Sequence, residues 1–148
     1  MRLSSRSVLG TIFAIALAIA FAGQLFAHGD VQPQPVDTTG LDSLGKEWRA
    51  ENPYRNGDKK VMVLVIEIGS GAYNQNCARC HGLEGMSGGL APDLRFLEED
   101  ADGDDWFVQR VRNGFHQNGV TKMPAYQDLL SQEALWCIRT YVDSLPED

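Results

Sequence analysis

Cysteine is scarce in this chain: three occur in 148 residues, and an odd number cannot pair completely into disulfides. Basic residues are also few, with 13 Lys and Arg against 20 Asp and Glu. This acidic balance disfavours binding to nucleic acid or to anionic lipid, because both repel a negative surface. After residue 27 the chain has no apolar run of the ~20 residues that a membrane-spanning helix needs. A fully disulfide-bonded framework, a nucleic-acid-binding protein and a later membrane span are therefore all disfavoured.

The first 27 residues have the layout of a secretory signal peptide. Arg2 and Arg6 give it a positive start. An apolar run then extends from Val8 to about Phe21, and small and apolar residues lead to Ala27. A membrane anchor is the alternative, but the run is short for a span and has no basic stop-transfer flank. We expect cleavage after Ala27, which leaves 121 residues with a formal charge of −9 and no stable membrane insertion.

The remaining chain divides into an extended arm, residues 28–58, and a folded domain, residues 59–148. Prolines and glycines interrupt any long helix in the arm, although Ser43–Glu51 is predicted to form a short helix carrying Trp48. In the domain, helices are predicted at about Ile66–Cys80, at Trp106–Asn113 after an N-cap at Asp104 or Asp105, and between Ser131 and Pro146, with loops at 82–89 and 115–126.

The last predicted helix has one apolar face, formed by Ala134, Leu135, Ile138, Tyr141, Val142 and Leu145. Trp136 points to the opposite side of this helix, and covering its indole would remove much apolar surface from water. The arm is the only segment that the core does not need, and it carries Trp48 and Tyr54. We therefore expect the arm to wrap the outside of the domain and to dock an aromatic side chain near the terminal helices.

The strongest chemical signal is the run Cys77-Ala78-Arg79-Cys80-His81. Two thiols separated by two residues lie about one helical turn apart, so both can form thioethers with the two vinyl groups of a haem. The imidazole of His81 can then reach the iron. A redox dithiol does not need the histidine, and a zinc site needs a second pair of ligands that the sequence lacks. We therefore predict one covalently attached haem c, with His81 as a ligand of its iron.

The second axial ligand must come from elsewhere in the chain. Met123 is favoured, because its thioether is a soft ligand and the proline that follows stiffens its loop. Met86 lies only five residues after the motif, and Met62 lies in an apolar run that is typical of a core. His116, seven residues before Met123, is the main alternative ligand, and an open site is a further one.

The second ring nitrogen of His81 needs an acceptor that orients the ring. A carbonyl in the segment 91–94 is expected to accept this bond, and that of Pro92 is preferred. Ligation by His81 and Met123 closes both faces of the iron, which leaves outer-sphere electron transfer as the chemistry and predicts that the protein is not an enzyme.

Two further features of the sequence are expected to have structural roles. The acidic segment 98–105 departs from the pattern of a calcium-binding loop. Counted from Asp100, the glycine is fourth (Gly103) and not sixth, and position twelve is Val111 and not Glu, so a solvated, helix-capping turn is expected. Cys137 is expected to be a buried free thiol, and an intermolecular disulfide is the alternative.

These residues together resemble the class I c-type cytochromes: a helix leading into the haem motif, a proline loop, a methionine loop and a C-terminal helix. The finer resemblance is to the cytochrome c550 type that accepts electrons from PQQ-dependent (quinoprotein) ethanol dehydrogenases in bacterial periplasms. It is carried by His28-Gly29-Asp30-Val31, Pro35-Val36-Asp37-Thr38, Asn52-Pro53-Tyr54-Arg55, Tyr73 through Glu84, and Ser87 through Arg95.

The resemblance implies a mainly α cytochrome c fold around one haem, with the extended arm added. It also implies a soluble periplasmic one-electron carrier, reduced by a quinoprotein alcohol dehydrogenase and oxidised by a downstream cytochrome or terminal oxidase. A peroxidase-like haem enzyme and a haem-based ligand sensor are the alternatives, and both require an open or labile sixth position on the iron.

Overall fold

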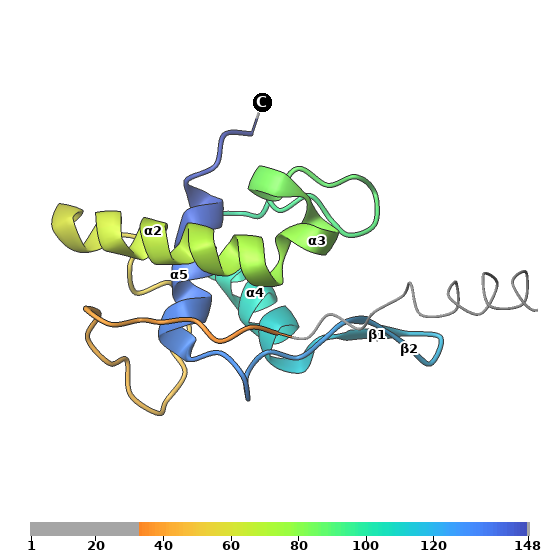
Figure 1. Cartoon of the computed structure of the whole chain (residues 1–148), viewed down its shortest axis with the longest axis horizontal. Coiled ribbons are helices and arrows are strands. Elements are labelled where there is room, and N and C mark those ends of the chain that lie inside the picture. Colours follow the sequence, from red (N-terminus) through yellow and green to blue (C-terminus); the bar gives the residue numbers. More distant parts are fainter. Residues whose placement is uncertain (1–32, 148) are drawn as a thin grey trace, which may run out of the picture. The chain divides into compact units, whose positions relative to one another are not determined.

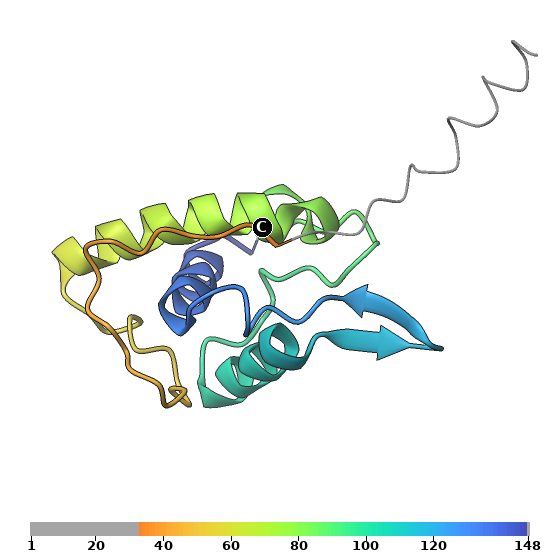
Figure 2. The same ribbon diagram turned by 60° about the horizontal axis from the view of Figure 1, so that its bottom comes forward.

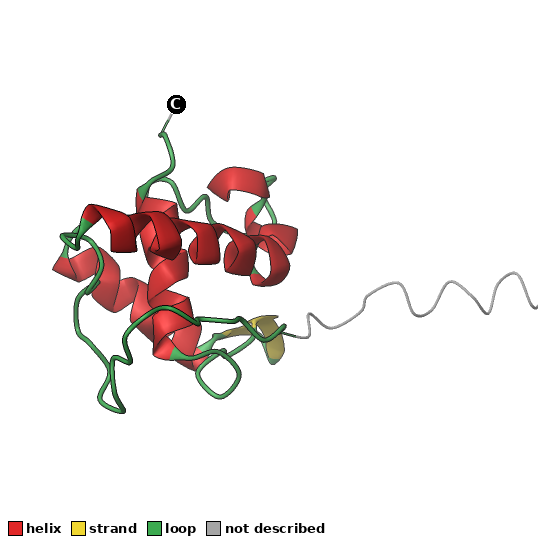
Figure 3. Ribbon diagram, turned by 60° about the vertical axis from the view of Figure 1, so that its left-hand side comes forward, coloured by secondary structure: helices red, strands yellow, loops and turns green. Residues whose placement is uncertain are grey.

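The structure, a computed structural model, describes residues 33–147. The predicted signal peptide and the first five residues of the predicted arm lie outside this range. The described helices are α2 (Lys59–Asn76), α3 (Ala78–His81), the 3-10 turn η1 (Leu83–Gly85), α4 (Ala101–Asn113) and α5 (Gln132–Asp143) (Figure 1). Strands β1 (Phe115–Gln117) and β2 (Val120–Met123) pair antiparallel, and Figure 3 shows this small sheet among helices and loops. The fold is therefore mainly α, as predicted, and none of the described helices is long and apolar enough to cross a membrane.

Helix α2 begins seven residues earlier than predicted. The carboxylate of Asp58 accepts the backbone N–H of Lys60 at 2.8 Å, which supplies the N-cap. The β-branched residues that suggested a strand lower helix propensity only slightly, and burial of Val65 in the core outweighs that cost. The helix also ends earlier than predicted, at Asn76, because Cys77 has φ −117° and separates α2 from α3.

Helices α2 and α5 cross at the centre of the fold (Figures 1 and 2), and glycine permits their close approach. A Cβ atom on Gly69 would lie 2.1 Å from the carbonyl oxygen of Cys137. One turn later the rings of Tyr73 and Tyr141 pack with centroids 5.4 Å apart. Cys137 is a buried free cysteine, as predicted.

Replacing Gly69 with alanine should destabilise the protein by about 1–3 kcal/mol, because the added methyl group overpacks this crossing. Gly71→Ala is the matched control on the same helix, since nothing lies within 4 Å of the position of its Cβ. That change should instead stabilise the fold by roughly 0.5–1 kcal/mol through helix propensity. Urea denaturation measures both values, and equal free energies of unfolding for the two variants would contradict this account of the crossing.

Helix α5 starts as predicted, because the hydroxyl of Ser131 accepts the N–H of Ala134. Its residues from Ala134 to Val142 are all buried, so the helix has no solvent-facing side over this stretch. Trp136, predicted to lie behind the core face, is 0% exposed and packs against Phe107, whose ring centroid is 6.1 Å away.

Helix α4 is five residues longer at its start than predicted. Asp100, not Asp104 or Asp105, is the N-cap, and its carboxylate accepts the N–H of Gly103 at 2.9 Å. The acidic segment therefore does cap a helix, but Asp104 is buried and not solvated. Gly114 ends the helix with φ 69°, in the left-handed region that glycine adopts readily.

The segment 115–126, predicted as a loop, contains the hairpin of β1 and β2. Asn118 and Gly119 form its turn, with φ values of 52° and 75°. An Asn-Gly pair with two positive φ angles is typical of a tight hairpin turn whose twist matches that of the strands. The hairpin places Met123 at the end of β2, paired with Phe115 at the start of β1.

The described part of the arm, residues 33–58, packs on the domain without forming a helix. The predicted helix at 43–51 is absent because side chains of α5 bind the backbone there. Glu133 accepts the N–H of Leu44 at 2.7 Å, and Gln132 Nε2 donates to the carbonyl of Gly45 at 2.7 Å. Trp48 lies half-buried, with the guanidinium carbon of Arg112 4.9 Å from its ring centroid.

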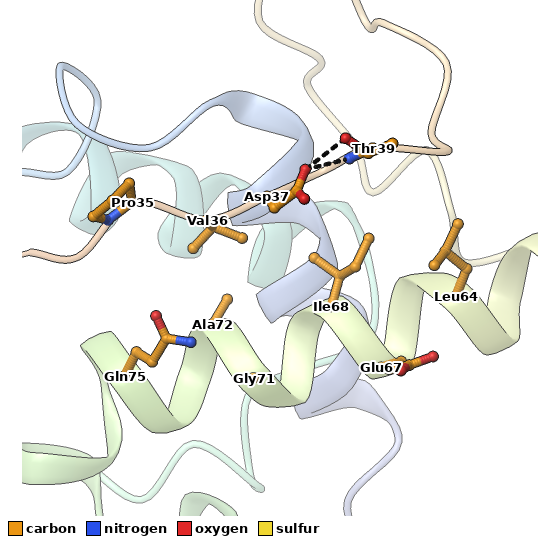
Figure 4. A pocket seen from close by; sticks show the side chains of 10 residues that line it. All are labelled: Pro35, Val36, Asp37, Thr39, Leu64, Glu67, Ile68, Gly71, Ala72 and Gln75. Atoms are coloured by element: carbon orange, nitrogen blue, oxygen red, sulfur yellow. Dashed lines mark hydrogen bonds between the residues drawn. The ribbon is translucent and has the colours of Figure 1, made fainter.

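The first described residues of the arm run beside α2. Figure 4 shows the segment from Pro35 to Thr39 above this helix, with Val36 directed towards Ile68 and Ala72. The two sides form an open groove. Asp37 accepts the backbone N–H and the hydroxyl of Thr39 at 2.9 and 2.7 Å, which fixes the turn that follows.

A buried ionic cluster fastens the end of the arm. Asp104 accepts two bonds from the guanidinium of Arg55, at 2.6 and 2.8 Å, one from Arg139 at 2.9 Å, and the N–H of Asn52 at 2.7 Å. Asp143 lies 2.6 Å from Arg139 and 3.2 Å from Arg55. Asp104 and Arg139 are both 0% exposed. This Asp104 cluster joins the arm, α4 and α5, and the burial of Asp104 and Arg139 weakens the screening of their charges by water.

Candidate haem site

The two motif cysteines lie where α2 gives way to α3. The backbone N–H groups of Cys80 and His81 donate to the carbonyl of Cys77 at 3.1 and 3.0 Å, which fixes the motif as one helical turn. Burial, with a smaller effect of Cys80, raises the pKa of the Cys77 thiol to about 12. A redox dithiol depends on a lowered thiol pKa, so the pair is poorly suited to that chemistry. Thioether attachment, in contrast, removes the titrating thiol altogether.

His81 is held from one side of its ring. Nδ1 lies 2.8 Å from the carbonyl oxygen of Pro92, the preferred partner in the sequence. A carbonyl can only accept, so Nδ1 carries the proton and Nε2 keeps the lone pair that binds a metal. Gly82 follows directly with φ 80°, and a Cβ there would lie 1.7 Å from the carbonyl oxygen of Met86. Only glycine fits this turn, which Tyr73 secures by donating from its hydroxyl to the Gly82 carbonyl at 2.7 Å.

The loop that presents the Pro92 carbonyl is itself fixed by an ion pair that the sequence did not reveal. Asp93 binds Arg95 at 2.9 Å and accepts the backbone N–H of Ser87 at 3.3 Å. The guanidinium of Arg95 lowers the pKa of Asp93 to about 2, so this carboxylate stays ionised. The hydroxyl of Ser87 also bonds the Ala91 carbonyl, which closes the loop just before Pro92.

Met123 is anchored from its backbone. A Cβ on Gly114 would lie 2.5 Å from the carbonyl oxygen of Met123, so the end of α4 sits directly against this residue. Tyr126 then donates its N–H to the Val111 carbonyl at 2.7 Å and its hydroxyl to the Asn76 carbonyl at 2.9 Å. The methionine loop is therefore bonded to the residue that precedes Cys77. Neither Tyr126 nor Asn76 had a recognisable signal in the sequence.

The other candidate ligands lie in different surroundings. His116 is an exposed residue of β1, and its Nδ1 lies 3.1 Å from the hydroxyl of Thr121. Met86 is exposed and Met62 is half-buried in the first part of α2. Met123 alone of these four packs against the apolar core.

The residues around the motif fit a large apolar cofactor. Six of the ten exposed large apolar side chains in residues 33–147 lie in two segments, 83–96 and 115–123. These segments follow His81 and lead to Met123, and Figures 1 and 2 show α3 and the hairpin on the same side of α5. A haem attached at Cys77 and Cys80 would cover apolar surface that is otherwise left to water. Two thiols, an imidazole and a thioether also form the donor set that haem c needs.

Comparison with known proteins points in the same direction. Residues 65–142 match the family described as cytochrome c oxidase, cbb3-type, subunit III. The chain is 52% identical over 146 residues to cytochrome c550 of Pseudomonas aeruginosa, an alignment that covers 99% of each protein. No solved structure matches the chain significantly.

Two larger proteins of Pseudomonas putida are also similar. Quinohemoprotein alcohol dehydrogenase ADH-IIG is 29% identical over 128 residues, and quinohemoprotein alcohol dehydrogenase ADH IIB is 38% identical over 85 residues. The alignments cover 82% and 53% of this chain but only 17% and 11% of the two dehydrogenases. The match to cytochrome c550 along the full chain, the matching family and the Cys77–His81 motif together show that this protein belongs to the class I c-type cytochromes, which bind haem c covalently.

Proposed function

We propose that this mono-haem electron carrier accepts single electrons from a quinoprotein alcohol dehydrogenase in the periplasm and passes them towards a terminal oxidase. The proposal is supported by the two quinohemoprotein alcohol dehydrogenases, which contain a stretch similar to this chain within a much longer protein. A separate cytochrome of the same kind can serve a dehydrogenase that lacks such a stretch.

Under this proposal each residue of the site either attaches the haem, binds its iron or orients a ligand. Cys77 and Cys80 attach the haem, His81 and Met123 bind its iron, and the Pro92 carbonyl holds the proton of His81 on Nδ1. The haem supplies a one-electron couple between ferric and ferrous iron. The Nδ1–H of His81 already has an acceptor in the Pro92 carbonyl, so the ring would not need to gain or lose a proton during electron transfer.

The packing of Met123 is the observation that carries the choice of a carrier over an enzyme. A peroxidase or a ligand sensor needs a free or exchangeable position on the iron. Met123 instead packs against the core, and Gly114 lies against its carbonyl. In the loop that follows, Tyr126 donates its hydroxyl to the Asn76 carbonyl. A methionine held in this way would occupy the second face of a bound haem, which would leave outer-sphere electron transfer as its chemistry.

Stopped-flow reduction tests the donor. The oxidised cytochrome is mixed with a purified quinoprotein alcohol dehydrogenase and ethanol, and haem reduction is followed from the visible spectrum. We expect reduction that saturates with cytochrome concentration and that is absent when ethanol is omitted. Failure of the dehydrogenase to reduce the haem while a chemical reductant succeeds would remove the dehydrogenase from the proposal. A high-spin spectrum with ready CO binding would favour the enzyme or the sensor instead.

A further inference from the structure

Arg110, in the last turn of α4, lies against two aromatic rings. Its guanidinium carbon is 5.2 Å from the ring centroid of Trp106 and 4.7 Å from that of Phe115. Trp106 is one turn earlier on the same helix, whereas Phe115 begins β1. We call these three residues the Arg110 stack. Each contact lies within the ~6 Å at which a cation is attracted to the face of a ring.

The Arg110 stack connects α4 to the strand beside Met123, because Phe115 and Met123 are cross-strand partners in the hairpin. Residues 115–122 are all exposed, so the hairpin has little apolar contact of its own with the domain. A two-stranded hairpin is at best marginally stable alone. Its position therefore depends on contacts at its base. Tyr126 bonds the chain that leaves β2, and the Arg110 stack is the side-chain contact that holds the start of β1.

We propose that Arg110 is a positioning residue for Met123: by binding Phe115 it holds the hairpin on α4 and keeps the methionine sulfur on the iron. This inference rests on the proposed ligation by Met123. The iron–thioether bond is weak enough that a loop free to move can release it, so the fraction of released methionine reports how well the hairpin is held. Removing the guanidinium should raise that fraction, with no change in the ligand itself.

Competition with free imidazole measures the released fraction in the oxidised holoprotein. Imidazole can bind the iron only after methionine leaves, so its apparent affinity rises in proportion to the open population. We expect Arg110→Ala to raise the apparent affinity about fivefold, a size that matches the loss of the one cation–ring contact that reaches the hairpin, the contact with Phe115. Arg110→Lys keeps a charge near the rings and should recover part of the effect. Phe115→Leu should act like Arg110→Ala. The double variant should add little, since both substitutions break the same contact between Arg110 and Phe115.

Arg112→Ala is the matched control. Arg112 lies two residues further along α4 and contacts a ring at a similar distance, but that ring is Trp48 of the arm. It also bonds Gln127 weakly, at 3.4 Å. This variant should lose comparable thermal stability while binding imidazole within about twofold of the wild type, because its contact does not hold the hairpin.

The outcomes separate this inference from the ligand proposal. Met123→Ala should lose the sulfur-to-iron charge-transfer band, and if the band persists both the ligation and the role of Arg110 are wrong. If Met123→Ala loses the band but Arg110→Ala binds imidazole like the wild type, only the role of Arg110 is overturned. Equal increases for Arg110→Ala and Arg112→Ala would also overturn it, since they would indicate general loosening of α4.

Discussion

The Met123→Ala variant is expected to keep its haem but to have a reduction potential lower by on the order of 0.1 V, within the ~0.8 V range that axial ligands set. The haem stays attached because Cys77 and Cys80 hold it covalently. The potential falls because the thioether stabilises ferrous iron more than the water or hydroxide that would replace it. Redox titration of the purified protein measures the change, and the ferrous form should acquire CO binding.

His116→Ala is the control for this experiment. His116 is the alternative axial ligand, and it lies exposed on β1 near Thr121. Removing it should leave both the potential and the spectrum as they are in the wild type. A spectrum that changes in His116→Ala and stays constant in Met123→Ala would assign the sixth ligand to the histidine.

Replacing Asp104 with asparagine should destabilise the fold by about 3–5 kcal/mol, because it leaves two guanidinium groups, of Arg55 and Arg139, with the single carboxylate of Asp143. At about 4 °C per kcal/mol, the midpoint of thermal unfolding should fall by roughly 12–20 °C. Asp105→Asn is the control, since Asp105 is the next residue of α4 and is exposed. That variant should change the midpoint by only a degree or two. A similar loss in both variants would mean that helix charge, and not the buried cluster, is responsible.

The same carboxylate sets an acid limit on stability. Hydrogen bonds from Arg55, the backbone of Asn52 and Arg139 outweigh burial and lower the pKa of Asp104 below 3.8. A carboxylate with a lowered folded pKa stabilises the protein above the unfolded value and loses that contribution as the pH falls through the folded one. Stability should thus fall below about pH 3.8, and Asp104→Asn should flatten this dependence. Burial raises the pKa of Asp143, so the titration of this group favours the folded state at low pH and partly offsets the loss from Asp104.

The haem motif and its partners were predictable because they depend on short spacings. Five consecutive residues specify the attachment, and the proline and methionine loops each carry their signal within a few residues. The hairpin was predicted only as a loop, although the segment contains Asn118-Gly119, because the short flanking strands are exposed and show no alternation of apolar residues.

The rest could not be read locally because it depends on partners far along the chain. Asp104 looked like an N-cap, but its role is fixed by Arg55 and Arg139, which lie 49 and 35 residues away. The helix expected around Trp48 fails to form for a similar reason: Glu133, 89 residues later, takes the N–H of Leu44. A pattern read over ten residues cannot reveal such competition for backbone groups.

The attachment of the arm also sets the order in which the protein can be completed. A chain is made from its N-terminus, so the arm is available before any of its partners. Those partners include Gln132, Glu133 and Asp143, which are among the last residues to be synthesised. Contacts between such distant residues form slowly, since a long loop must close first. The arm is thus made before α5 but can be fixed only after it, and until α5 exists the arm remains open to proteases and to other chains.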